Sequence, residues 1–170
     1  VIHAGLYYPE GSYKERFCIE GKSLLYRYCL DNGVPFERTG KWIVSGAGEE
    51  FRLEAIHDRA LQNNVPIKRL SRNQIRNREP QLRCTAVLES PSTGVVDALH
   101  LLQCLIDDLK HAGGVVQCRA ETVSIWVEGG KPQALLRDGT NVRADLVINA
   151  AGLDALALVP EEVTHGYENY

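Results

Sequence analysis

The pattern that most constrains the fold is the amphipathic segment from Ala98 to His111. Its large aliphatic residues recur at helical spacing and form one continuous apolar face, made of Leu101, Leu102, Leu105, Ile106 and Leu109. Asp97 stands where an N-cap belongs, and Ala112-Gly113-Gly114 ends the helix. A face of this kind has to be covered by other elements. We therefore expect this helix to pack into the core of a larger fold.

Helical and strand patterns alternate along the rest of the 170-residue chain. Helices are predicted over Tyr13–Leu30, Glu49–Asn63 and Arg72–Arg78, the last of them capped by Ser71. Strand patterns occupy Pro35–Ser45 (around a Thr39-Gly40 turn), Ile67–Leu70, Thr85–Leu88, Val115–Cys118, Thr122–Val127, Ala134–Leu136 and Val142–Asn149. The predicted fold class is mixed α and β, of the α+β or α/β type.

Composition narrows the class of protein further. With 44% hydrophobic and 24% charged residues, the chain has the composition of a globular protein. Its formal net charge is −3 and no basic stripe stands out, so no nucleic-acid partner is expected. Its apolar runs are too short for a membrane helix. The chain opens on Val1 and contains no methionine, so we expect it to be cut from a longer protein.

The cysteines do not indicate a metal site or a disulfide framework. There are five of them, widely spaced and without a CxxC pair. We therefore expect reduced thiols, as in an intracellular protein, and no bound metal.

Three segments have the residue types of ligand-binding turns. The first is Val1–Pro9, with His3 between apolar residues; the second is the hydroxyl-rich Ser90–Asp97; and the third is Leu146–Ala155, a buried strand that runs into small residues and a helix. Each has an ordinary structural alternative, which residue chemistry alone favours. These are a buried histidine bonded to a backbone carbonyl, a loop that caps a helix, and plain strand–helix packing. No GxGxxG, P-loop, nucleophile elbow or HExxH motif occurs.

In this order, the three segments resemble the D-amino-acid-oxidase-like superfamily of FAD-dependent oxidoreductases, and within it the branch that oxidises 2-hydroxyglutarate. The resemblance also includes Glu20–Tyr26, Glu79–Leu82 and Ala112–Gly114, and it covers nearly the whole chain. Val-Ile-His-Ala-Gly-Leu-Tyr-Tyr-Pro and Ser-Pro-Ser-Thr-Gly-Val-Val-Asp are fairly specific to that branch. Asn-Ala-Ala-Gly is common to the superfamily.

The resemblance implies the middle portion of such an enzyme. It predicts a substrate-binding mixed sheet with flanking helices, plus inner parts of an FAD-binding Rossmann-like domain. The N-terminal βαβ unit, whose GxGxxG turn holds the FAD pyrophosphate, would lie before Val1, and a closing segment after Tyr170. Residues 1–34, 95–125 and 143–160 are assigned to the FAD side, and residues 35–94 and 126–142 to the substrate side. The isolated chain is then expected to be an inactive fragment that holds no stable FAD and leaves apolar surface exposed.

The resemblance also implies the residues of the site. FAD is the expected cofactor, and its predicted contacts are His3, Ala4, Gly5, Ala120, Ala151 and Gly152. Tyr7 and Tyr8 are predicted to face the substrate, a 2-hydroxy acid. His3 is predicted to be the base that takes the hydroxyl proton while a hydride leaves for the flavin, which would convert L-2-hydroxyglutarate to 2-oxoglutarate. Arg16, Lys41 and Arg52 could bind a dicarboxylate, but a surface position is the preferred interpretation of each.

Two other functions stay open at this stage. One is a truncated, non-catalytic relative that serves as a scaffold or interaction module, and the other is a superfamily oxidase that acts on an amino acid or on glycerol 3-phosphate. The electron acceptor is also open, and with it the choice between oxidase and dehydrogenase. Members of the family are mitochondrial in eukaryotes and cytoplasmic or bound to the inner membrane in bacteria. The same compartments, with peripheral membrane association of the parent protein, are expected here.

Overall fold

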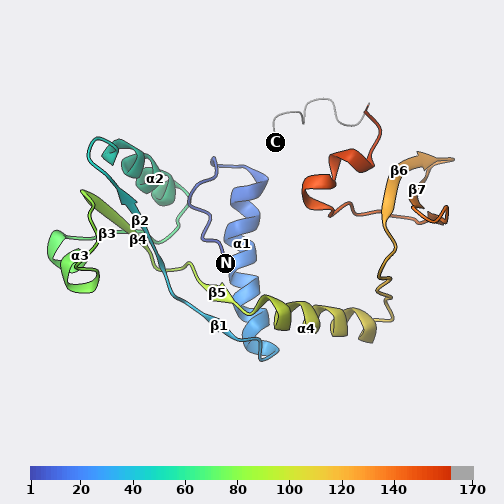
Figure 1. Cartoon of the computed structure of the whole chain (residues 1–170), viewed down its shortest axis with the longest axis horizontal. Helices are drawn as coiled ribbons and strands as arrows, with labels where there is room; N and C mark the ends of the chain where they lie inside the picture. Colours follow the sequence, from blue (N-terminus) through green and yellow to red (C-terminus); the bar gives the residue numbers. More distant parts are fainter. Residues whose placement is uncertain (162–170) are drawn as a thin grey trace. The chain divides into compact units, whose positions relative to one another are not determined.

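The computed structural model describes residues 1–161, which divide into two compact units (Figure 1). The first unit is Val1–Gly114 and the second begins at Val115. The first contains helices and short strands, and the second an antiparallel sheet followed by two short 3-10 turns. The predicted mixed α and β class is therefore confirmed.

The helices follow the local signals of the sequence closely. They are α1 (Tyr13–Asp31), α2 (Glu50–Gln62), α3 (Arg72–Arg78) and α4 (Ala98–His111). Ser71 and Gln74 form a full capping box at the start of α3, and the Asp97 carboxylate accepts the first N–H groups of α4. Gly33, with a φ of 67°, follows the end of α1 in the left-handed conformation that favours glycine.

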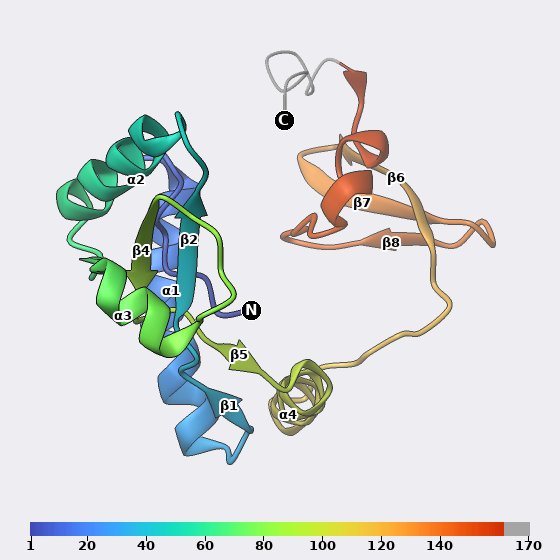
Figure 2. The ribbon, with the colours of Figure 1, turned by 60° about the vertical axis from the view of Figure 1, so that its left-hand side comes forward.

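The strands of the first unit pair over long distances in the sequence. They are β1 (Phe36–Glu37), β2 (Lys41–Ser45), β3 (Lys68–Arg69), β4 (Ala86–Ser90) and β5 (Val95–Val96). Although only Arg38, Thr39 and Gly40 separate β1 from β2, the two do not form a hairpin. Instead β1 pairs with β5, and β2 pairs with β4 in the sheet β2-β4-β3, all antiparallel (Figure 2).

The core of this unit lies where the N-terminal segment meets α1 and α2. Its buried members are Ala4, Leu6, Ala60 and Val65, with Ile19, Ile43, Ile56 and Ile67 packed against them. Leu6 is fully buried, which contributes roughly 1.5–3 kcal/mol relative to an exposed side chain. The N-terminal segment is thus an integral part of the fold.

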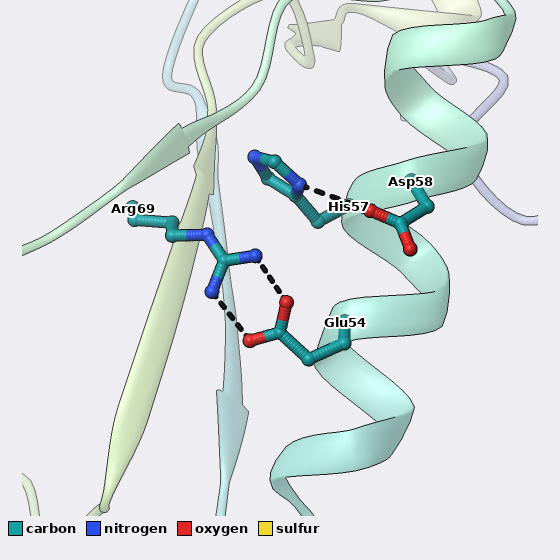
Figure 3. Close-up of polar contacts among 4 residues, drawn as sticks. All are labelled: Glu54, His57, Asp58 and Arg69. Carbon is teal, nitrogen blue, oxygen red and sulfur yellow. Dashed lines mark hydrogen bonds and ion pairs between the residues drawn. The ribbon is translucent and has the colours of Figure 1, made fainter.

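A polar cluster joins α2 to the edge strand β3 (Figure 3). Arg69 of β3 forms a two-pronged ion pair with Glu54 of α2, and the His57 Nδ1 lies 3.6 Å from an Asp58 carboxylate oxygen. The Arg69 guanidinium holds the pKa of Glu54 below its usual value. Both members of the ion pair are half exposed, so the pair adds little stability and mainly orients the helix.

Helix α4 differs from the sequence expectation in its packing. None of its residues is buried, and Leu99 is 81% and Leu102 54% exposed. Its contact with α1 includes Leu101 and Leu105 at a shared apolar groove and the hydrogen bond from the Tyr28 hydroxyl to Asp108 (2.6 Å). The expectation of a packed core face is therefore wrong for the first unit taken by itself, because much of that face stays exposed there.

The second unit is a three-stranded antiparallel meander of β6 (Thr122–Glu128), β7 (Lys131–Leu136) and β8 (Asn141–Arg143). Its turns lie at Gly129-Gly130 and Asp138-Gly139, as predicted. The predicted strand Val115–Cys118 is irregular, and the predicted strand Val142–Asn149 stops at Arg143.

The second unit also lacks the buried strand that the sequence predicts after β8. Leu146 and Ile148 are 73% and 80% exposed. Two 3-10 turns, η1 (Gly152–Asp154) and η2 (Leu156–Leu158), replace the helix predicted to follow. The reason is the lack of a partner, because a strand needs a neighbour and no described residue pairs with this segment.

We propose that residues 1–34, 95–125 and 143–160 belong to the FAD side of a Rossmann-like fold and residues 35–94 and 126–142 to the substrate side. Among the described helices, none has the length and hydropathy required to cross a membrane.

Candidate functional site

The predicted catalytic histidine lies in a tightly held N-terminal segment. The Ile2 N–H donates to the Gly94 carbonyl (2.7 Å) and the Gly94 N–H donates back to the Ile2 carbonyl (3.2 Å), which joins the segment to the loop before β5. Ile2 and Ala4, on either side of His3, are both buried. Because neighbouring side chains of an extended chain point in opposite directions, His3 projects away from its buried neighbours and is only half-buried.

Gly5 fixes the orientation of the His3 ring. Its φ of 89° lies in the region that favours glycine, and a Cβ there would come within 2.9 Å of Ile19 Cγ1. The Gly5 N–H donates to His3 Nδ1 (3.0 Å), so neutral His3 carries its proton on Nε2. The structural alternative expected a buried His3 bonded to a backbone carbonyl. In the structure, the partner of His3 is instead a backbone N–H donor.

Two tyrosines surround the imidazole. The ring centroids of Tyr7 and Tyr8 lie 5.8 Å and 5.3 Å from that of His3. The Arg59 guanidinium of α2 donates to the Tyr7 carbonyl (2.9 Å) and holds the backbone of this turn. The predicted grouping of His3, Tyr7 and Tyr8 is therefore present.

Lys41 joins this group, although the sequence favoured a surface position for it. It begins β2, is half-buried, and its Nζ lies 4.4 Å from the centroid of the Tyr7 ring. Burial, together with the positive charge of Lys41, lowers the pKa of His3 below 6.5. We refer to His3, Tyr7, Tyr8 and Lys41 as the His3 cluster. The sequence named Lys41 as a possible substrate cation but could not place it beside His3, because its position depends on the long-range pairing of β2 with β4.

The other two cations considered for the substrate lie at the surface, as expected. Arg16 pairs with Glu20 (3.0 Å) and Arg52 with Glu49 (3.3 Å) along their own helices. The His3 cluster therefore offers one cation, a neutral imidazole and two phenol hydroxyls. This combination can hold a carboxylate and exchange a proton with a neighbouring hydroxyl. Within residues 1–161, no His, Cys, Asp and Glu side chains gather as a metal site.

The Ser90–Asp97 loop owes its small residues to internal packing. A Cβ at Gly94 would lie 2.2 Å from the Tyr26 hydroxyl and 2.5 Å from the Glu37 carbonyl. The Ser90 and Thr93 hydroxyls bond to one another in the interior (3.0 Å), and Asp97 caps α4. The structural alternative proposed for this loop is thus confirmed for its glycine and its aspartate.

The remaining predicted cofactor contacts lie in the second unit. Ala151 lines a pocket of about 610 Å³, together with Asn149 and Ala150, and Ala120 directly precedes Glu121 on the same pocket wall. Gly152 has a φ of 62°, and nothing lies within 4 Å of the position that its Cβ would occupy.

Asn149 organises this turn, a role that the sequence analysis missed. Its side-chain oxygen accepts the Ala151 N–H (3.2 Å), and its amide donates to the Ala155 carbonyl (2.8 Å). The signal was available, since asparagine commonly bonds to backbone two residues onward in turns.

The pocket in the second unit has both apolar and polar walls. Its volume lies within the roughly 300–1,000 Å³ typical of cofactor sites. Val123, Ile125 and Val147 give it an apolar wall suited to an aromatic ring, and the paired Glu121 and Arg137 add a polar edge. The helix that the sequence predicts at this turn is not formed, since η1 is a single 3-10 turn.

Comparison with known proteins identifies related sequences. A protein family described as "FAD dependent oxidoreductase" matches residues 1–167. Human mitochondrial L-2-hydroxyglutarate dehydrogenase is 32% identical over 166 residues, which cover 90% of this chain and 36% of the human protein. L-2-hydroxyglutarate dehydrogenase of Escherichia coli K12 is 29% identical over 160 residues, or 94% of this chain and 38% of that protein. The chain thus spans well under half the length of these relatives.

Solved structures share the fold at low sequence identity. Glycine oxidase from Geobacillus kaustophilus superposes with a TM-score of 0.75 at 17% identity, over 92% of this chain and 45% of that one. The FAD-bound, dithionite-reduced L-α-glycerophosphate oxidase from Mycoplasma pneumoniae gives a TM-score of 0.76 at 20% identity, over 88% of this chain and 41% of that one.

Proposed function

Since the chain belongs to the family of FAD-dependent oxidoreductases, we propose that the protein containing it oxidises a 2-hydroxy acid, and specifically L-2-hydroxyglutarate to 2-oxoglutarate. The observation that carries this proposal is the His3 cluster, where a neutral imidazole lies next to a half-buried lysine and two tyrosines. A dicarboxylate with a hydroxyl group next to one carboxylate needs this pairing of a cation with a proton acceptor. Relatives named L-2-hydroxyglutarate dehydrogenase support the choice of substrate.

FAD, when bound, supplies the acceptor for the hydride of the substrate. We assign the contacts near its reactive ring to His3, Ala4 and Gly5, and the remaining contacts to Ala120, Ala151 and Gly152. The open space around Gly152 and the apolar pocket beside Ala151 support the second group. The match of residues 1–167 to the family of FAD-dependent oxidoreductases supports the first.

His3 is assigned the hydroxyl proton of the substrate. Its unprotonated nitrogen is Nδ1, which accepts the Gly5 N–H. For His3 to accept the hydroxyl proton, the Gly5 N–H therefore has to leave Nδ1, either because the substrate hydroxyl displaces it or because the ring proton moves from Nε2 to Nδ1 and frees Nε2. In both cases the lowered pKa keeps His3 neutral near pH 7 and ready to accept a proton.

Lys41 is assigned a carboxylate of the substrate. Its ammonium group lies over the Tyr7 ring and has no carboxylate partner within residues 1–161. A charge-assisted hydrogen bond to a substrate carboxylate would supply that partner and orient the hydroxyl toward His3. The tyrosine hydroxyls add neutral donors at the same place.

The two alternatives receive less support. Glycine oxidase and glycerophosphate oxidase share the fold at 17% and 20% identity, a likeness that shows the fold alone. A non-catalytic scaffold has no need for a half-buried lysine next to a neutral histidine. For a eukaryotic source the mitochondrion is the proposed compartment, as in the name of the human relative. For a bacterial source it is the cytoplasm or the inner-membrane surface.

The test is the His3→Ala variant of the complete, FAD-loaded protein. Loss of a positioned base should lower kcat with 2-hydroxyglutarate by about 10²–10⁴-fold, while the flavin spectrum and FAD content stay unchanged. His100→Ala, which removes an exposed imidazole from α4, should leave kcat as it is. An unchanged kcat in His3→Ala would contradict the assignment of His3.

A further inference from the structure

We propose that a further pocket, which lies in the first unit between α1 and the loop before β5, binds a phosphate group. The pocket has a volume of about 330 Å³ and is lined by Lys22, Ser23, Tyr26, Arg27, Leu30, Arg38 and Ser92. It shares no residue with the His3 cluster, and no role has been assigned to these side chains above. The proposal does not depend on the oxidation of a 2-hydroxy acid.

Two cations face this pocket without a carboxylate partner. Lys22 of α1 is half-buried, and both its burial and the positive charge of Arg38 lower the pKa of its ammonium group. Within residues 1–161, neither Lys22 nor Arg38 forms an ion pair. Arg27 differs from them, because Asp31 lies 3.7 Å from its guanidinium.

The two cations are held in place by the surrounding structure. The Lys22 Nζ donates to the Ser92 hydroxyl (3.3 Å), and the Arg38 guanidinium lies 4.4 Å from the centroid of the Tyr26 ring. Tyr26 is itself 5% exposed, and its hydroxyl donates to the Ser92 carbonyl (3.2 Å). One buried aromatic ring therefore supports Arg38 on its face and the Ser92 backbone at its hydroxyl.

Gly94 allows the loop before β5 to lie against Tyr26 of α1. Any side chain there would collide with the Tyr26 hydroxyl, only 2.2 Å from the position of a Cβ. The loop can then approach α1 closely enough for Ser92 to reach Lys22. The small residues of this loop thus shape one wall of the pocket, in addition to packing against the core.

A phosphate group suits this pocket better than a carboxylate. Two like charges in a partly buried space repel one another, and one ligand with close to two negative charges compensates both. Its oxygens can accept from Lys22, from Arg38 and from the hydroxyls of Ser92 or Ser23. The volume leaves room for several water molecules in addition, at about 30 Å³ each.

The test is calorimetric titration of the complete, FAD-loaded protein with inorganic phosphate, at fixed pH and ionic strength. FAD must be saturating so that its own phosphate-binding residues are occupied. We expect one saturable phosphate per chain and at least tenfold weaker binding in both Lys22→Gln and Arg38→Gln. Lys110→Gln, which removes an exposed lysine from the end of α4, should bind phosphate like the unmodified protein.

Two further arms make the result decisive. In the first arm, methyl phosphate replaces inorganic phosphate, which tests whether the site binds a phosphate ester. Binding of either compound supports the proposal if it depends on Lys22. Lys22→Glu pairs its new carboxylate with Arg38, so this variant should fold with undiminished thermal stability and bind no phosphate. The proposal is overturned if phosphate gives no saturable heat, or if Lys22→Gln and Lys22→Glu bind it as tightly as the unmodified protein.

Discussion

At the scale of single residues, the sequence predicted that His3, Tyr7 and Tyr8 lie together, but not the contacts that hold them there. His3, Tyr7 and Tyr8 lie close together because Gly5 turns the chain and the buried Ile2 and Ala4 fix its direction. A nine-residue motif can indicate such a grouping, since all of its parts are local. Lys41 could not be found in this way, because it reaches the cluster only through strand pairing.

Replacing Gly5 tests how rigidly the His3 ring is held. Gly5→Ala introduces backbone strain and a Cβ 2.9 Å from Ile19 Cγ1, so it should lower the free energy of unfolding by about 3 kcal/mol. Gly11→Ala is the matched control, with a φ of 75° and nothing within 4 Å of the Cβ position, and should cost about 1 kcal/mol. Equal losses in denaturant titrations of the two variants would show that the tight contact at Ile19 has no energetic weight.

The acid limb of the pH profile tests the electrostatic link between Lys41 and His3. Burial and Lys41 lower the pKa of His3, so the neutral base persists as pH falls and kcat/KM should decline only below pH 6.5. Lys41→Met removes the charge and should move this limb to higher pH, while raising KM for 2-hydroxyglutarate about tenfold or more. In Lys110→Met the limb should stay in place. A limb that does not move in Lys41→Met would exclude electrostatic coupling between the two residues.

At the scale of elements, the four helices of the first unit were predicted well, the helix expected after Gly152 was not formed, and strand partners were not predicted. Caps such as Ser71 and Asp97 and breakers such as Gly33 act within a few residues, so they can be read directly from the sequence. Strand pairing is a long-range choice. The sequence predicted strands around the Thr39-Gly40 turn, but β1 and β2 each pair with a strand far away in the sequence.

The hydrogen bond between α1 and α4 gives a prediction at this scale. The Tyr28 hydroxyl donates to Asp108, which raises the pKa of Tyr28 to about 12. Because the folded-state pKa is raised, the bond stabilises the fold at neutral pH and is lost as pH rises through that value. Asp108→Asn should bring the pKa of Tyr28 down toward 10 in an ultraviolet difference titration and speed amide exchange in α4.

Asp107→Asn is the control for this measurement, because Asp107 accepts a hydrogen bond from Gln103 on the same helix and does not contact Tyr28. Its tyrosine titration should match that of the unmodified protein. If Asp108→Asn also matched it, the hydrogen bond would not determine the pKa of Tyr28.

At the scale of the whole molecule, hydrophobic periodicity predicts which surfaces are suited to burial but not which elements cover them. The apolar face of α4 and the run from Leu146 to Ile148 both read as core, yet both are largely exposed in residues 1–161. Hydrophobic periodicity shows which face of a segment is suited to burial. The periodicity is present in the sequence whether or not another element covers that face. The family resemblance, in contrast, rests on short motifs such as Val1–Pro9, which do not depend on these faces being covered.

The most direct test of the proposed oxidation of L-2-hydroxyglutarate is anaerobic reduction of the bound flavin in the complete protein. L-2-hydroxyglutarate should bleach the visible flavin absorption, and it should do so far more slowly in His3→Ala at equal FAD content. Glycine and glycerol 3-phosphate should leave the spectrum unchanged. Bleaching by either of these two compounds but not by L-2-hydroxyglutarate, or by none of the three, would contradict the proposed function.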